Sequence, residues 1–235
     1  MDPDTIARLT DKVIAKFTTL PKNQRLIIAI AGIPGSGKTT LAQAMTTTLN
    51  SRLQTTAGTN STSTAPPVVC ISMDGFHYTR AYLSTMHNAV EAHARRGAAF
   101  TFDSAGWATL VTTLGAPIDA ATPHIDVPGF DHSVKDPVQA AVRVSPESRI
   151  VICEGNYLAM NVEPWRSAAQ RYDDLWLVEV DKQVARERLV RRHLAAGICS
   201  VREEAEKRAD ENDLVNGAEI LGHLISEISE HIKST

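Results

Sequence analysis

The chain has 235 residues, with 24 Lys and Arg against 27 Asp and Glu, and a formal net charge of −3 at pH 7. This length favours one domain over residues 1–235, and the lack of a basic excess excludes nucleic acid as an expected partner. No apolar run approaches the roughly 20 residues that span a bilayer, and the acids in the start Met1–Asp4 disfavour a targeting peptide, so a cytoplasmic protein without a membrane partner is expected.

The first part of the chain begins with an amphipathic pattern. Residues 4–20 place apolar side chains at helical spacing up to Pro21, and residues 25–31 form a short apolar run rich in β-branched residues, which is typical of a strand buried on both faces. A glycine-rich turn and a helix over residues 39–49 are expected to follow. Residues 51–67 are rich in Ser, Thr, Ala and Gly, and predict a flexible surface loop.

Strands and helices alternate along the rest of the chain, around a polar middle part, residues 74–146, that no pattern assigns. Further strands are predicted over residues 68–72, 149–153 and 174–180, and further helices over residues 184–196 and 203–232. Strands separated by helices imply a parallel sheet with helices on both faces. Ligands bind such sheets beyond the carboxyl ends of the strands, so the polar residues at those ends are the candidate site.

A complete phosphate-binding motif follows the first predicted strand. Gly32-Ile33-Pro34-Gly35-Ser36-Gly37-Lys38-Thr39 matches the Walker A pattern G-x-x-x-x-G-K-[ST] without a mismatch, between a strand and a helix. Its glycines let backbone N–H groups point at phosphate oxygens, at the positive end of the next helix. Lys38 is expected to reach the β- and γ-phosphates and the Thr39 hydroxyl to bind Mg²⁺, with Thr40 in the same site. The N-K-x-D signal of GTPases is absent from the sequence, so ATP is the expected nucleotide.

Two carboxylates follow predicted strands. Asp74 comes after the strand at residues 68–72, which we expect beside the strand of the phosphate loop, and it is the candidate base for an acceptor hydroxyl. The alternative role of Asp74 is to cap the next turn. Glu154 ends the strand at residues 149–153, where a Walker B carboxylate would hold Mg²⁺. The alternative for Glu154 is an acid that contacts solvent alone.

Arginines gather in the helix near residue 190, and residues 184–200 are expected to form a lid. Arg188 and Arg192 share a helical face, and Arg191 flanks it. Such a face can cover the triphosphate and neutralise transition-state charge, with Arg191 as the favoured member. The alternative is a solvated basic face that pairs with acids such as Glu187.

Six short stretches together carry a family resemblance. They are Gly32 to Thr39, Ser72-Met73-Asp74-Gly75-Phe76-His77, Arg95-Arg96-Gly97-Ala98-Ala99-Phe100-Thr101-Phe102-Asp103, Pro128-Gly129-Phe130-Asp131-His132, Glu154-Gly155 and the run Arg188 to His193. Through them the chain resembles the P-loop kinases grouped as phosphoribulokinase, uridine kinase and bacterial type I pantothenate kinase. The stretch Arg208 to Asn216 is similar to an Asn-containing segment that can lie near the nucleotide base in these kinases, although a polar helix face explains it as well.

The resemblance implies a fold, an activity and a set of acceptor-site residues. The implied fold is the P-loop NTPase three-layer αβα sandwich, with a five-stranded, mainly parallel sheet, a helical lid and an acceptor-site region over residues 75–146. The implied activity is transfer of the γ-phosphoryl group of ATP, with Mg²⁺, to the hydroxyl of a nucleoside, a pantothenate-like or a sugar-like molecule. The candidate acceptor-site residues are Arg96, Phe130, Asp131, His132, Asn156 and Tyr157, together with His77 and Tyr78. The last two are candidates because they follow Asp74, and a structural role is the alternative for each. The alternative is a P-loop ATPase or nucleotide-dependent regulator without an acceptor, and a homodimer remains compatible with either.

Overall fold

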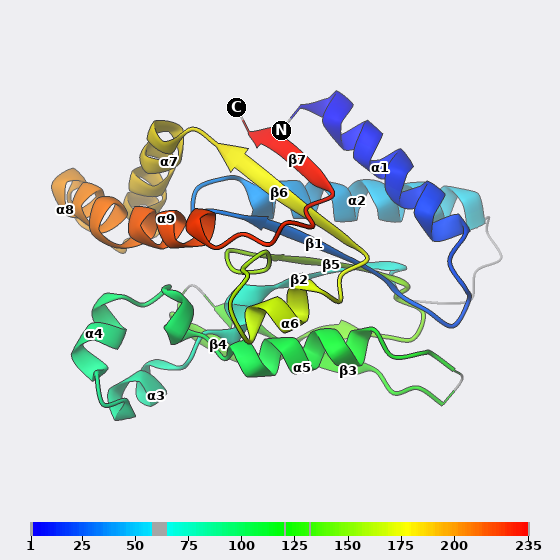
Figure 1. The fold of residues 1–235 in the computed structure, drawn as a ribbon, viewed down its shortest axis with the longest axis horizontal. Coiled ribbons are helices and arrows are strands. Elements are labelled where there is room, and N and C mark those ends of the chain that lie inside the picture. Colours follow the sequence, from blue (N-terminus) through cyan, green and yellow to red (C-terminus); the bar gives the residue numbers. More distant parts are fainter. Residues whose placement is uncertain (1, 58–64, 120, 132, 235) are drawn as a thin grey trace.

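The computed structural model describes residues 2–57, 65–119, 121–131 and 133–234, which are organised around a five-stranded parallel sheet (Figure 1). Its strands are β1 (Leu26–Gly32), β2 (Val68–Ser72), β5 (Ile150–Gly155), β6 (Asp174–Val180) and β7 (Glu230–Ser234), in the spatial order β2-β5-β1-β6-β7. Every neighbouring pair is parallel, and Glu154 is in register with both Ile30 and Ser72. The carboxyl ends of β1, β2 and β5 therefore meet at one edge, and the predicted parallel sheet is confirmed.

One expectation about strand order is wrong. The strand beside β1 on this side is β5, and β2 lies one position further out. The residues of β1 and β5 are all buried, whereas β2 has two half-buried positions, Cys70 and Ser72, as an edge strand does. Apolar runs alone do not rank strands within a sheet, which is why the sequence pattern left this order open to error.

Helices cover both faces of the sheet. Helix α1 (Pro3–Thr18) begins at Asp2, whose carboxylate accepts from Thr5 N at 3.1 Å, and it packs with α2 (Lys38–Ala57) on one face. Figure 1 shows these two helices on one side of the sheet, with α5 (Ser104–Leu114) and α6 (Trp165–Ala169) on the other. Alternate residues of β1 serve the two cores, because successive side chains of a strand point to opposite faces.

Helix α2 is longer than the sequence pattern predicts. It continues to Ala57, so residues 51–57 of the expected flexible loop are helical, and residues 58–64 lie outside the described residues. The side chain of Asn50 exchanges two hydrogen bonds with the backbone of Val68, at 2.9 and 3.0 Å, and Leu53 packs against the core. These contacts with distant residues stabilise a helical end whose Ser, Thr and Ala composition suggests a loop.

The middle part of the chain is structured. It contains the short helices α3 (Arg80–Thr85) and α4 (Ala89–Ala94), 3₁₀ turns at Met73–Phe76 and Ala99–Thr101, helix α5, and a separate antiparallel hairpin of β3 (Ile125–Asp131) and β4 (Asp136–Val144). Trp107, Leu110, Val111 and Leu114 are buried at helical spacing in α5, a signal that was present in the sequence. The hairpin gives a weaker signal, since its register shifts between Val127 and Gly129.

The C-terminal part begins as predicted and ends differently. Helix α7 (Lys182–Ala195) is followed by α8 (Arg202–Arg208), a π-helical turn (Ala209–Asp213) and α9 (Leu214–Gly222), with the expected break between α7 and α8. The helix expected up to residue 232 is wrong beyond Gly222, where the chain turns to form β7. Ile225, Ile228 and Ile232 have helix-like spacing, yet Ile232 lies in the core through the pairing of β7 with β6. Each helix of the described residues is too short or too polar to cross a membrane.

Candidate active site

The turn between β1 and α2 has the backbone of a phosphate-binding loop. Gly35 and Gly37 have φ angles of +79° and +91°, in the left-handed region that other residues adopt only with strain. Helix α7 packs directly on this turn, because a Cβ atom at Gly35 would lie 2.7 Å from the carbonyl oxygen of Ala185. The amide-lined turn is therefore held between the sheet and α7, with the N-terminus of α2 at its end.

Thr39 and Glu154, the two residues predicted to hold a metal ion, are in contact at the ends of β1 and β5, with Lys38 close by. The hydroxyl of Thr39 donates to Glu154 Oε2 at 2.9 Å, and Glu154 is only 4% exposed. Burial raises the pKa of Glu154, and the nearby ammonium of Lys38 opposes that shift. Burial lowers the pKa of Lys38, while Glu154 and Asp74 oppose it. These oxygen groups are the kind of ligands that Mg²⁺ prefers.

Asp74 lies on the 3₁₀ turn that follows β2. The residue that caps this turn is Ser72, whose hydroxyl accepts a hydrogen bond from Asp74 N at 3.3 Å. The carboxylate of Asp74 is therefore not needed as the cap of this turn. A Cβ atom at Gly75 would lie 2.1 Å from the carbonyl oxygen of Pro128, so the turn fits tightly against the β3–β4 hairpin. His77 Nδ1 donates to the carbonyl oxygen of Asp74 at 2.8 Å and closes the turn.

A cavity of about 410 Å³ brings together residues predicted for each part of the site. Its lining includes Lys38, Thr39, Asp74, His77, Arg96, Phe130, Glu154, Asn156 and Arg192. The pKa values of Lys38 and Glu154 both respond to the charge of Asp74, which is the electrostatic signature of three groups that share one site. The ends of β1, β2 and β5 therefore contribute to one cavity even though β5 separates the other two strands.

Three predicted acceptor-site residues, Tyr78, Asp131 and Tyr157, are absent from the described lining of this cavity and make other contacts. Tyr78 packs on Tyr82 with ring centroids 4.4 Å apart. Tyr157 is fully buried, and its hydroxyl donates to the carbonyl oxygen of Gly97 at 2.7 Å. The carboxylate of Asp131 accepts from Ser133 N at 2.7 Å and shapes the hairpin turn. His132 lies outside the described residues.

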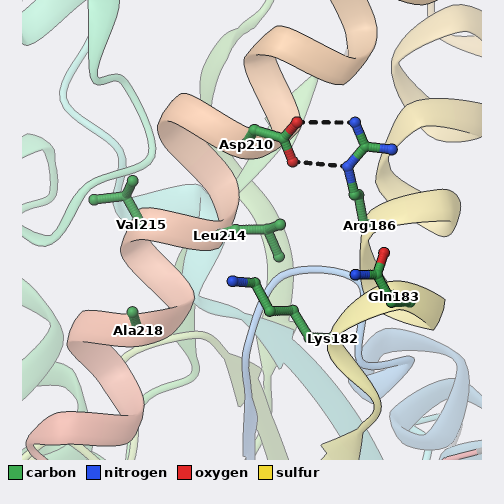
Figure 2. Close-up of a pocket in the computed structure, with 7 residues that line it drawn as sticks. All are labelled: Lys182, Gln183, Arg186, Asp210, Leu214, Val215 and Ala218. Atoms are coloured by element: carbon green, nitrogen blue, oxygen red, sulfur yellow. Dashed lines mark hydrogen bonds and ion pairs between the residues drawn. The ribbon is translucent and has the colours of Figure 1, made fainter.

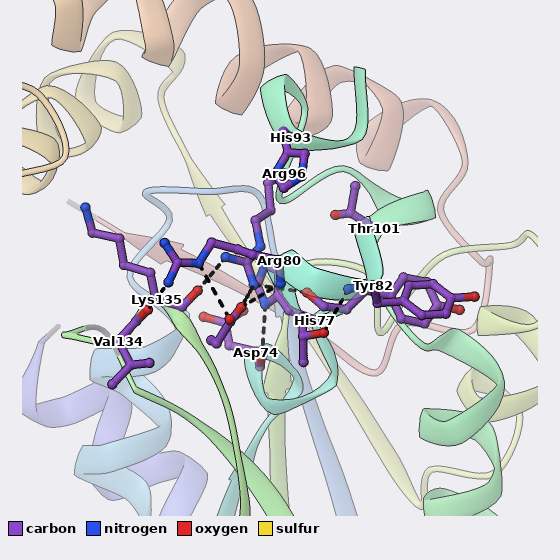
Figure 3. Close-up of polar contacts among 12 residues, drawn as sticks. Asp74, His77, Arg80, Tyr82, His93, Arg96, Thr101, Val134 and Lys135 are labelled. Carbon is purple, nitrogen blue, oxygen red and sulfur yellow. Dashed lines mark hydrogen bonds and ion pairs between the residues drawn. The ribbon is translucent and has the colours of Figure 1, made fainter. Parts of the chain in front are cut away.

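The side of the cavity that carries the predicted acceptor residues His77, Arg96 and Phe130 has an aromatic wall and a fixed arginine. The ring of His77 lies 3.9 Å from that of Phe102 and 5.0 Å from that of Phe130, measured between centroids. Arg96 stands over Phe130 at 5.7 Å and donates to Asp136 Oδ1 at 2.6 Å. Burial alone would raise the pKa of Asp136, but hydrogen bonds from the Arg80 backbone and the Arg96 guanidinium hold that pKa below its usual range. Figure 3 shows this group of polar contacts.

The arginines of α7 take three different positions. Arg188 Nη1 donates to the carbonyl oxygen of Gly35 at 3.2 Å and to Ser234 Oγ at 2.9 Å, which ties α7 to the phosphate loop and to β7. Arg192 lines the cavity, with Nη2 3.9 Å from Asp213 Oδ1. The side chain of Arg191 is 67% exposed and lies beside Glu187, the pairing that the sequence had offered as the alternative. Thr40 is likewise exposed, on the first turn of α2.

Sequence reasoning missed the cavity residues that come from α3, α4 and the hairpin turn, which are Arg80, His93 and Lys135. From the stretch Arg208 to Asn216, which the family resemblance had placed near the nucleotide base, Arg208, Asp213 and Asn216 line the same cavity. Arg95 connects two of these segments, because its guanidinium donates to Asn212 Oδ1 at 2.9 Å and to Asn216 Oδ1 at 2.6 Å. The π-helical turn that ends at Asp213 is a type of irregularity often found at functional sites. Single-sequence pattern carries no signal for such long-range contacts.

A second cavity, of about 520 Å³, lies between α7 and α9 (Figure 2). Arg186 and Asp210 form a two-bond ion pair across its upper part, with N–O distances of 2.7 and 2.8 Å. Because the guanidinium already meets a carboxylate, this cavity offers less free charge to an anionic ligand than the cavity at the strand ends.

Comparisons with known proteins agree with this geometry. No family model matches the chain. An ATP-dependent kinase-like protein of Aspergillus versicolor is 46% identical over 149 residues, which cover 63% of this chain and 87% of that relative. A candidate uridine kinase of Schizosaccharomyces pombe is 39% identical over 197 residues, or 84% of this chain and 78% of that protein. The solved structure of a candidate fructose transport system kinase from Silicibacter sp. TM1040 matches with a TM-score of 0.79 and 28% identity, over 96% of this chain and 98% of that one.

Proposed function

Because the chain belongs to the P-loop kinase family of these uridine kinase-like and ATP-dependent kinase-like relatives, we propose that it transfers the γ-phosphoryl group of ATP to an alcohol hydroxyl of a small molecule, with Asp74 as the base. One observation carries the proposal. Lys38, Thr39, Glu154 and Asp74 come from the ends of different strands and line the same cavity. A nucleotide-binding group and a separate carboxylate are the two requirements of phosphoryl transfer to an alcohol.

Each residue has a role that its position supports. The backbone of the Gly32 to Thr39 loop and the ammonium of Lys38 would hold the phosphates. Asp74 accepts the proton of the acceptor hydroxyl while the hydroxyl oxygen forms a bond to the γ-phosphorus. The bond between the γ-phosphorus and the β,γ-bridging oxygen breaks at the same time, and ADP is released. Mg²⁺, held by Thr39 and Glu154, would neutralise charge on the phosphate oxygens.

The lid belongs to the same proposal. Helix α7 already contacts the phosphate loop through Arg188, and Arg192 lines the cavity while Arg191 is exposed. We therefore favour Arg192 over Arg191 as the lid arginine that faces the phosphates. Residues 184–200 would move as the lid, since loops and helices over an active site commonly close on substrate.

The test compares two aspartate variants on ADP release. We expect Asp74→Asn to lower kcat by about 10²–10⁴ while the Kd for ATP with Mg²⁺ stays unchanged, because only the proton acceptor is lost. The control is Asp11→Asn, since Asp11 is 68% exposed on α1 and pairs with Arg52. Acceptors would be nucleosides, pantothenate, sugars and sugar acids.

Two outcomes would contradict the proposal in different ways. Full turnover by Asp74→Asn with a verified acceptor would remove Asp74 from its role. A slow release of ADP that no acceptor stimulates would favour an ATPase or nucleotide-dependent regulator instead.

A further inference from the structure

The acceptor side of the cavity carries an excess of positive charge. Among the described residues that line it, Arg80, Arg96, Lys135 and Arg208 are cations in addition to Lys38 and Arg192, which lie beside Glu154 and Asp213 respectively. The carboxylate found with this second group of cations is Asp136. It accepts from Arg96 Nη2 at 2.6 Å and lies 3.5 Å from Arg80 Nε. Together with Asp74, which lines the same cavity, two carboxylates thus accompany four cations, which we call the acceptor-side cations.

Lys135 is presented at the cavity by an unusual backbone conformation. It occupies the hairpin turn between β3 and β4 with a φ angle of +60°, in the left-handed region that costs free energy for a residue with a Cβ atom. Its carbonyl oxygen accepts from Arg96 Nη1, and its N–H donates to the carbonyl oxygen of Asp131 at 2.7 Å. Figure 3 shows the side chains of Arg80, Arg96 and Lys135 gathered around this turn. The hairpin turn therefore fixes the backbone of Lys135, and this exposed residue borders the cavity.

Arg208 comes from a part of the chain far from the hairpin in sequence, at the end of α8. Its guanidinium lines the cavity, and its Nε is buried without a hydrogen-bond partner among the residues that the structure describes. Asn212, one turn later, donates to the carbonyl oxygen of Arg96 at 3.3 Å, which fixes this helical segment over the acceptor side. A buried guanidinium N–H without a partner is costly, so a movement of this side chain toward an anionic ligand in the cavity would be favourable.

Asn156 adds a neutral polar group to the same cavity. It follows Glu154-Gly155 at the end of β5, and its side-chain oxygen is buried without a hydrogen-bond partner in the described part of the chain. A ligand hydroxyl could donate to this oxygen. The cavity therefore has an oxygen of Asn156 that accepts no hydrogen bond, near Thr39 and Glu154. It also has cations on the side where the phosphoryl acceptor would bind.

We propose that the phosphoryl acceptor is a small polyhydroxylated anion, whose carboxylate or phosphate group binds Lys135 and Arg208 beside Arg96 while its hydroxyls reach Asn156 and Asp74. This inference rests on the proposed kinase function. A neutral nucleoside or sugar would leave the half-buried guanidinium of Arg208 without a counter-charge. Arg80 and Lys135 are exposed, and Arg96 is already paired with Asp136. Carboxylate and phosphate are the anions that guanidinium groups bind in paired hydrogen bonds.

The first experiment compares acceptors that differ only in the anionic group. ADP release and product mass would be measured with D-gluconate against D-glucitol, D-glycerate against glycerol, and D-ribose 5-phosphate against D-ribose, with uridine as a further neutral acceptor. A small-molecule cell extract, incubated with the enzyme and labelled ATP, extends the search beyond this panel. We expect the phosphorylated product to carry a carboxylate or a phosphate besides the new phosphoryl group, and the pair that responds identifies which of the two.

The second experiment removes the charges singly. Lys135→Gln and Arg208→Gln should each raise the KM for the anionic acceptor by about tenfold or more and change the KM for ATP less than twofold, because each variant removes a charge-assisted hydrogen bond to the acceptor alone. Lys22→Gln, in the exposed turn before β1, and Arg202→Gln, on the same helix as Arg208 and paired there with Glu206, are the matched controls and should leave both KM values unchanged.

The outcomes separate this inference from the function on which it rests. A product from a neutral acceptor, formed more efficiently than from its anionic counterpart, overturns the inference and leaves the kinase in place. An equal rise of both KM values in Arg208→Gln also overturns it, since Arg208 would then serve the nucleotide. The lack of any acceptor-dependent product from panel and extract contradicts the kinase function and this inference with it.

Discussion

The proposed nucleotide end and the proposed acceptor end of the cavity are built in different ways. The nucleotide end comes from one unbroken stretch, Gly32 to Thr39, and from Glu154 on the neighbouring strand β5. The acceptor end is assembled from the turn after β2, residues 95–97, the β3–β4 hairpin and residues 208–216, which meet through hydrogen bonds between distant parts of the chain.

This difference separates the chemistry from the choice of substrate. A phosphate loop is defined by backbone conformation over eight neighbouring residues, so it tolerates little change and is visible in the sequence. The acceptor end depends on side-chain charges carried by segments outside the main sheet. Those charges can change without a disturbance of β1 or β5, so related chains can keep the phosphoryl donor and alter the acceptor.

The largest effect expected at the nucleotide end alone comes from Lys38. Lys38→Ala removes the ammonium that is expected to reach the phosphates, and should lower kcat/KM for ATP by about 10²–10³, the usual loss for one preorganised charged donor. Steady-state kinetics with ATP varied at saturating acceptor measure it. Phosphoryl transfer at the normal rate would contradict the nucleotide site.

A smaller effect is expected from the charge that organises the acceptor end. Asp136→Asn leaves Arg96, whose side chain is 13% exposed, without its carboxylate, and should raise the KM for the acceptor about tenfold with an unchanged KM for ATP. The matched control on the same hairpin is Asp126→Asn, since Asp126 forms an exposed ion pair with Arg143 and such pairs contribute little. If both variants behave alike, the hairpin does not position the acceptor through Asp136.

The smallest effect concerns the support of residues 95–97. Tyr157→Phe removes the hydroxyl that donates to the Gly97 carbonyl oxygen and should lower the free energy of unfolding by about 1 kcal/mol, with a modest rise in the KM for the acceptor. Urea denaturation of this variant and of Tyr82→Phe, where the side chain is half exposed, provides the comparison. A change in the KM for ATP instead of the acceptor would show that the two ends are less separate than their construction indicates.

The sequence predicted the parts of the molecule that depend on local pattern. The strands of the main sheet except β7, the phosphate loop, Asp74 and Glu154 follow from short apolar runs and the residues at their ends, and the structure brings these groups to one cavity. The family resemblance supplied the acceptor region, of which His77, Arg96, Phe130 and Asn156 line the cavity.

The failures share a physical cause, which is long-range contact. Helix α2 extends because Asn50 binds the backbone of Val68, and β7 forms because β6 offers an open edge. Tyr157 follows the Glu154-Gly155 pair closely in sequence, yet its ring points into the core. Likewise, helical spacing allowed either Arg191 or Arg192 to face the cavity, and only the packing of α7 on the phosphate loop distinguishes them.

The position of β5 between β1 and β2 sets the width of the reaction space. Neighbouring strands lie about 4.8 Å apart, so the phosphate loop after β1 and Asp74 after β2 begin about 10 Å apart, with Glu154 midway. This distance accommodates a phosphoryl group, its leaving oxygen and an incoming hydroxyl arranged in a line. Backbone hydrogen bonds between the paired strands maintain this distance, and they do not depend on which acceptor is bound. Exchange of the side chains around the cavity would thus alter substrate preference while the separation between the phosphate loop and Asp74 stays constant.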